Sequence, residues 1–395
     1  MSTFTGIDEH GVEVTYKDHK RFWYLYAYFT PALVAAFYIA FIMTGNALWL
    51  AAPAAWIFGV IPIIDIVVGG DDHNPPEAVM PAMMKDKFYR FSVYPHFAVA
   101  FALFAFTIYI VGSYALPWWA YVSLLLSAGI GSGGILLLTH ELGHKTNKLD
   151  QLMAKIGNSM IGYGHFCIEH NRGHHVMVST PEDPASSRMG ESIYRFALRE
   201  ISGTFARGWH HERERLEKMG LGFWHYKNDV LQSYALSLII IGLCVAAFGP
   251  LILLFIVPHH VLSWYTLTQA NYIEHYGLLR QKLPSGKYER TQPHHSWNTN
   301  HLFSNMQTFH LQRHSDHHAN PLRPYQVLRD FPDLPTLPNG YIGCYSLAAI
   351  PPLWFKIMDK KVMDWAGGDI TKVNVDPKAK ARLYRKYAPE LTPAE

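Results

Sequence analysis

Six apolar runs of about 20 residues dominate the sequence and limit what it can fold into. A helix needs about 20 apolar residues to cross the hydrocarbon core of a bilayer. The runs pair into three hairpins, with turns near 45–46, 114–117 and 249–250. The alternative, that some runs are core helices of a soluble protein, does not account for six runs of this length. The sequence therefore predicts an all-α membrane protein whose transmembrane helices lie at about 22–44, 47–69, 93–113, 118–139, 231–249 and 251–270.

The basic residues are confined to one side of these predicted spans. No Lys or Arg occurs between Arg21 and Lys85, between Arg90 and Lys145, or between Lys227 and Arg280. The positive-inside rule places the basic side in the cytoplasm, so we expect a multi-pass membrane protein whose polar part faces the cytoplasm. Two cytoplasmic blocks, 140–230 and 271–395, should form a helical cap, and residues 1–395 should form a single domain. The net charge of only +3 does not suggest a nucleic-acid partner.

The histidines cluster where the predicted spans end. Box one, HELGH, closes the fourth span, and a single histidine in NYIEHYG closes the sixth. Box two is EHNRGHH and box three is HSDHH, both in the cytoplasmic blocks. Three boxes at helical spacing would be a rare accident. These motifs contain His140, His144, His170, His174, His175, His275, His314, His317 and His318.

Helical spacing predicts which of these histidines act together. Residues at i and i+4 share a helix face, so His140 can bind a metal with His144, and His170 with His174. The three histidines of box three, at i, i+3 and i+4, also share a face. Adjacent residues point about 100° apart, so His174 and His175 could reach different metals.

Nine imidazoles are too many for one ion and suit two, and imidazole binds iron, copper, zinc and nickel. A ligating imidazole needs a hydrogen bond to its second ring nitrogen. The candidates adjoining a box histidine are Glu141, Glu169, Glu274 and Asp316.

Two other functions compete with a redox centre. Box one is literally HExxH, the zinc-protease signature, but such a site uses three protein ligands and leaves six or more clustered histidines unexplained. A metal transporter would place its ligands along a path across the membrane, whereas these boxes gather on one face. Two nitrogen-ligated metals at a membrane surface suit oxidation of an unactivated C–H bond, by hydroxylation or by desaturation.

The motifs HELGHK, EHNRGHH, LQRHSDHHA and NYIEHYG together resemble the bacterial membrane-bound alkane 1-monooxygenases. These belong to the superfamily of histidine-box di-iron membrane hydroxylases and desaturases. The flanks PEDPASSRMGESIYRF, PHHSWNTNH and VMDWAGGD are also similar, so the resemblance covers nearly the whole chain. Desaturases usually have HxxHH as box two, whereas this chain has HxxxHH. Hydroxylation of alkyl-aromatic methyl groups and desaturation of fatty-acyl chains remain the alternatives.

The resemblance implies O2-dependent terminal hydroxylation of medium-chain n-alkanes at two Fe ions, with all nine box histidines as ligands. It also implies electrons from a rubredoxin that is reduced by a rubredoxin reductase. The three cysteines are far apart and form no CxxC pair, so the rubredoxin must be separate or fused beyond residue 395. Basic residues at 195–227 and 280–290 could contact it, although the positive-inside pattern explains them equally well. Within the spans, Trp56, Phe58 and Phe104 are candidates to limit how far a hydrocarbon enters.

Overall fold

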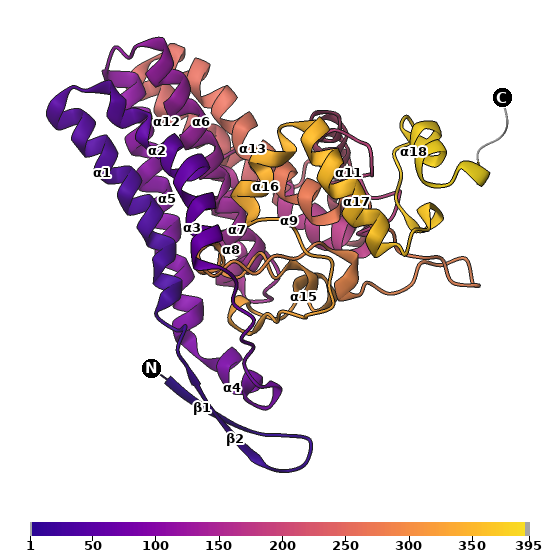
Figure 1. Ribbon diagram of the computed structural model, residues 1–395. Coiled ribbons are helices and arrows are strands. Elements are labelled where there is room, and N and C mark those ends of the chain that lie inside the picture. Colours follow the sequence, from indigo (N-terminus) through magenta and orange to yellow (C-terminus); the bar gives the residue numbers. More distant parts are fainter. Residues whose placement is uncertain (1, 392–395) are drawn as a thin grey trace.

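The computed structural model describes residues 2–391, and most of them are helical. Figure 1 shows most of the long apolar helices gathered in one bundle at the left and the C-terminal part of the chain, in yellow, at the right. Among the described residues, five helices are long and apolar enough to cross a membrane, which confirms five of the six predicted spans in position. These helices are Trp23–Thr44 (η1, Trp23–Tyr28, and α1, Phe29–Thr44), α5 (Lys87–Ser113), Trp118–Gly143 (α6, Trp118–Gly133, and α7, Ile135–Gly143), α12 (Asp229–Phe248) and Pro250–His275 (η6, Pro250–Ile252, and α13, Leu253–His275).

The second predicted span is a shorter and less regular helix than the sequence suggests. A 3₁₀ turn, η2 (Ala47–Leu50), precedes an apolar helix over Ala52–Val68. That helix joins α2 (Ala52–Ala55) and α3 (Ile61–Val68) through a π-turn, η3 (Trp56–Val60). The Ile61 N–H bonds to the Trp56 carbonyl five residues back, and Pro62, which follows, has no N–H to donate.

The all-α prediction is wrong at the N-terminus. Strands β1 (Ser2–Ile7) and β2 (Glu13–Asp18) pair antiparallel, with Ser2 opposite Asp18. The hairpin extends away from the helices at the bottom of Figure 1. Asp8 closes its turn by accepting hydrogen bonds from the N–H groups of His10 and Val12. The segment is short and polar, so its alternating pattern is a weaker signal in the sequence than the long apolar runs.

The other helices lie outside the five candidate spans. The C-terminal segment joins them through backbone hydrogen bonds, from Met189 N to Asn374 O and from Asn374 N to Gly277 O, two residues after α13. These helices are α4 (Met80–Lys85), α8 (Lys148–Met160), α9 (Phe166–Glu169), α10 (His175–Met177), α11 (Ile193–Lys218), α14 (Leu302–Gln307), α15 (His314–Ala319), α16 (Tyr341–Ala348), α17 (Pro351–Trp365) and α18 (Lys380–Tyr387). The remaining short turns are η4 (Glu77–Val79), η5 (His170–His174), η7 (Pro293–His295), η8 (Tyr325–Val327), η9 (Ile370–Lys372) and η10 (Pro389–Leu391).

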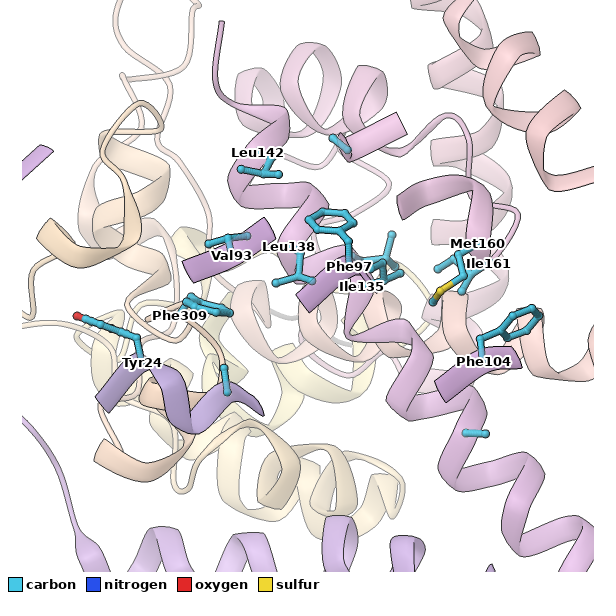
Figure 2. Close-up of a cluster of buried hydrophobic side chains, with 14 of the residues drawn as sticks. Tyr24, Val93, Phe97, Phe104, Ile135, Leu138, Leu142, Met160, Ile161 and Phe309 are labelled. Carbon is cyan, nitrogen blue, oxygen red and sulfur yellow. The ribbon is translucent and has the colours of Figure 1, made fainter. Parts of the chain in front are cut away.

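Buried apolar side chains fix α7, the helix that carries box one. Figure 2 shows Phe97 of α5 beside Ile135 and Leu138 of α7. Gly157 of α8 lets these helices approach closely, because a Cβ there would lie 2.4 Å from the Thr139 side chain and 2.7 Å from that of Phe97. Small residues allow such close packing of helices. The core thus holds α7 from several sides and sets where its last turn points.

Candidate metal centre

Four separate segments bring the nine box histidines together. His140 lies in the last turn of α7, and His144 immediately follows that helix. Box two occupies the π-turn η5 and the start of α10, and box three forms most of α15. His275 is the last residue of α13. The segments come from both halves of the chain, so only the folded protein assembles the cluster.

The nine histidines form two groups, in each of which the candidate ligand atoms lie within 4.8 Å of one another. The two groups are adjacent, because the ring centroids of His175 and His318 are 4.4 Å apart. Each group contains histidines only. One group has five members, His140, His144, His170, His175 and His317, and the other has four, His174, His275, His314 and His318.

The Nε2 atoms converge within each group. His175 Nε2 lies 3.0 Å from His170 Nε2 and 3.1 Å from His317 Nε2, and His318 Nε2 lies 2.8 Å from His314 Nε2. The Nε2 atoms of the other four, His140, His144, His174 and His275, are buried and have no hydrogen-bond partner among residues 2–391. Buried polar atoms normally have a partner, so this convergence fits a shared ion in each group.

Burial keeps most of these imidazoles neutral, which is the form that binds a metal. It lowers the pKa of His144 to about 3. Burial, together with neighbouring histidines, also lowers the pKa of His170, His175, His317 and His318 well below the usual value. Nitrogen donors of this kind fit two transition-metal ions.

The structure corrects the predicted pairing within boxes two and three. His170 and His174 were expected to share a metal, but they lie in different groups, and His170 is grouped with His175 instead. The reason is the π-turn over His170–His174, in which the ladder advances by five residues rather than four. Box three, which is an ordinary α-helix, is also divided, with His317 in one group and His314 and His318 in the other.

Of the four predicted acidic partners, only Glu274 contacts a box histidine through its side chain, with its Oε2 3.2 Å from His314 Nε2. That nitrogen is the one that converges with His318 Nε2, so Glu274 does not hold the second ring nitrogen as predicted. The other three bind cations: Glu141 pairs with Lys145, Glu169 with Arg207, and Asp316 with Arg323.

The partner that sequence reasoning missed is Asp183, whose Oδ2 lies 2.8 Å from His174 Nδ1. Both side chains are almost fully buried. Burial alone would lower the pKa of His174, but the charge and hydrogen bond of Asp183 outweigh burial, so the pKa of His174 is raised. In the same way, burial alone would raise the pKa of Asp183, but the charge and hydrogen bond of His174 lower it. The only sequence signal was the position of Asp183 in the flank PEDPASS.

An apolar cavity of about 290 Å³ leads to the centre. Its lining includes Val34 and Tyr38 of α1 together with three box histidines, His140, His170 and His314. The lining does not include the three aromatic residues predicted to limit entry, Trp56, Phe58 and Phe104. On the helix that carries Trp56 and Phe58, the side chains of Ile57 and Ile61 line the cavity instead. Phe104 is buried against His259, with ring centroids 5.3 Å apart.

A third, smaller group consists of Glu289, His294 and His295. The His295 ring already has a partner on both nitrogens: Nδ1 accepts from the Gln292 N–H, and Nε2 lies 3.2 Å from Glu289 Oε1. A neutral imidazole that accepts at Nδ1 carries its proton on Nε2 and has no lone pair left for a metal. This group therefore differs from the two larger ones, whose Nε2 atoms converge.

The apolar helices and the nine-histidine centre together define a multi-pass membrane metalloprotein. The fatty acid desaturase family model matches residues 116–346, the region that contains all nine histidines. Alkane 1-monooxygenase of Ectopseudomonas oleovorans is 46% identical over 350 residues, which cover 86% of this chain and 87% of that protein. Alkane 1-monooxygenase of Pseudomonas putida is 44% identical over 382 residues, covering 94% and 92%.

The chain therefore belongs to the alkane 1-monooxygenase family. The hydroxylase component of a xylene/toluene monooxygenase from Pseudomonas putida is also similar, at 25% identity over 346 residues, which cover 86% of this chain and 89% of that component.

Proposed function

We propose that this protein hydroxylates the terminal carbon of medium-chain n-alkanes at two irons, using O2 and electrons from reduced rubredoxin. The observation that carries the proposal is an apolar cavity whose lining includes histidines of both groups of converging nitrogens. The identity of 44–46% to alkane 1-monooxygenases supports the reaction and the choice of iron. The proposed ligands are the five and the four histidines of the two groups.

The side chains of the cavity define what the protein contributes to this reaction. Apolar residues such as Val34, Ile57 and Ile61 would bind a hydrocarbon chain by removing its surface from water. The histidines of the same lining, including His140 and His314, would hold the metals beside the bound chain. When bound, two irons supply reductive activation of O2, so that one oxygen atom enters the C–H bond and the other leaves as water, with two electrons and two protons consumed.

We also propose how the protein lies in the membrane. The helix over Ala52–Val68 has 17 residues, about 26 Å at 1.5 Å per residue, which is long enough to serve as the sixth span. Residues 1–395 would then form one domain in the bacterial inner membrane, with three helical hairpins and a helical cap that carries the histidines. The absence of Lys and Arg from the hairpin turns supports a cytoplasmic position for that cap, where rubredoxin and its reductase are available.

An isotope experiment tests the reaction. Purified protein is given octane, reduced rubredoxin and ¹⁸O2 gas, and we expect the label in 1-octanol. An alkene product would instead support a desaturase, and label that enters only from water would contradict a monooxygenase. Xylene as a competing substrate tests the alkyl-aromatic alternative raised by the relative at 25% identity.

A ligand variant provides the control. His314 lines the cavity and belongs to the four-histidine group, so His314→Ala should abolish hydroxylation while the protein still inserts into the membrane. Iron analysis should find about two irons in the wild-type chain and little zinc. Full activity with zinc alone, or wild-type turnover by the variant, would refute the proposed centre.

A further inference from the structure

An arginine from another helix lies across the π-turn of box two. Arg207 of α11 contacts the carboxylate of Glu169, which immediately precedes the turn, with Nε 2.8 Å from Oε1. Its Nη2 also lies 2.7 Å from Asp183 Oδ1. Asp183 in turn holds His174, the last residue of the turn, through Nδ1 at 2.8 Å. One guanidinium thus connects both ends of the turn that divides box two between the two groups.

The contact depends on a glycine within the turn. A Cβ on Gly173 would lie 2.4 Å from Arg207 Nε and 2.9 Å from Glu169 Oε1. Real Cβ atoms essentially never come this close to another atom, so a side chain at 173 would displace the guanidinium. The glycine between Arg172 and His174 therefore has a steric role that the spacing of the histidines does not reveal.

Arg207 neutralises two buried carboxylates, which would be destabilised without it. The side chains of Glu169 and Asp183 are 5% and 0% exposed, and Arg207 is the cation that both contact. A buried carboxylate that loses its partner costs several kcal/mol or takes up a proton. Asp183 has further hydrogen bonds from the Ser186 hydroxyl and the Ala185 N–H, so its position is fixed from more than one direction.

We propose that Arg207 is a positioning residue for the metal of the four-histidine group, acting through Asp183 on the orientation and basicity of His174. The proposal rests on the proposed function, because it assumes that this group binds iron. Residues that hold the second ring nitrogen of a ligating histidine change metal affinity by about 10–100-fold when they are removed. The five-histidine group receives no such contact from Asp183, so the effect should fall on one iron of the two.

Iron affinity measured on the full-length protein tests this inference. Detergent-purified protein loaded with ⁵⁷Fe(II) is titrated with a chelator, and each iron is followed by its Mössbauer doublet. We expect Arg207→Gln to weaken one of the two irons by about 10–100-fold and to leave the other unchanged. Arg207→Lys keeps the charge but loses the two-way contact, and should give an intermediate loss from the same site.

Two comparisons separate positioning from general damage. Arg195 of the same helix makes a similar two-nitrogen contact with Asp376, at 2.8 and 3.2 Å, away from the histidines. Arg195→Gln should therefore leave both irons at wild-type affinity. Asp183→Asn should reproduce the one-site loss, and adding Arg207→Gln to it should have little further effect, because both changes act through His174.

The outcomes distinguish this inference from the proposed function. A wild-type chain that binds fewer than two irons would contradict the di-iron proposal itself. If wild-type protein binds two irons and the Arg207 variants match it, or lose both irons equally, the positioning role is refuted and the di-iron proposal stands. If Arg207→Gln fails to insert, Arg207→Lys and Gly173→Ala decide the question, since each displaces or weakens the same contact.

Discussion

Glu200→Gln should make the protein more stable above neutral pH. Glu200 lies on α11, is fully buried, and accepts hydrogen bonds from Thr268 and Asn271 of α13. Burial, assisted by the charge of Glu169, raises its pKa from 4.5 to about 7 although the two hydrogen bonds and the charge of His174 oppose this. Glutamine has nearly the same shape, and its amide can still accept from Asn271 while donating to the Thr268 hydroxyl.

The direction of this pH dependence follows from which state, folded or unfolded, holds the Glu200 proton. Between pH 4.5 and about 7 the unfolded chain has lost the Glu200 proton while the folded chain keeps it, so stability falls as pH rises through this range. At high pH the shift of the Glu200 pKa lowers the free energy of unfolding by about 3 kcal/mol. Between about pH 5.5 and about pH 8 the free energy of unfolding of the wild-type protein should fall by about 2 kcal/mol because of Glu200. Glutamine does not titrate, so the variant should not show this part of the loss.

Thermal unfolding in detergent at the two pH values measures the effect. With an unfolding entropy of about 2.1 cal/mol/K per residue, 2 kcal/mol corresponds to roughly 2–3 °C in Tm for a chain of this length. Glu212→Gln on the same helix is the matched control, because Glu212 is equally buried but pairs with Arg215 at 2.6 Å. That variant should be less stable than wild type at both pH values. A Glu200→Gln variant whose Tm changes with pH as the wild type's does would refute the reasoning.

Two further substitutions test the division of the histidines and the placement of the helix over Ala52–Val68. His317→Ala should weaken the iron of the five-histidine group and His318→Ala that of the four-histidine group, so the two variants should alter different Mössbauer doublets; the same doublet in both would contradict the grouping. Asp65→Ala removes the buried carboxylate that accepts hydrogen bonds from the backbone N–H and hydroxyl of Ser304. It should lower the Tm through a loss of roughly 1.5–3 kcal/mol in the free energy of unfolding. An unchanged Tm would show that this contact does not hold the helix over Ala52–Val68.

Much of the fold was predictable because its signals are local. A run of 20 apolar residues requires a helix wherever it lies in a membrane, so five spans could be placed from composition alone. The second span was less accurately predicted because its π-turn depends on backbone geometry at Trp56–Val60. The β1–β2 hairpin was missed because alternation in a short polar segment is a weak signal beside long apolar runs.

The candidate site separates into what helix geometry dictates and what distant contacts dictate. Adjacent positions on a helix point about 100° apart, which led to the prediction that His174 and His175 serve different metals, and the structure places them in different groups. The same argument applies to His317 and His318 and would have divided box three correctly.

Box two was paired wrongly because spacing alone assumes an α-helix. At its π-turn, the guanidinium of Arg207 from α11 packs against Gly173 and contacts Asp183. The carboxylate of Asp183, from a separate loop, contacts Nδ1 of His174. None of these contacts is local, so no count of residues between histidines could reveal them. The motifs therefore predict how many candidate ligands there are. Which group each histidine joins depends on packing between segments far apart in the chain.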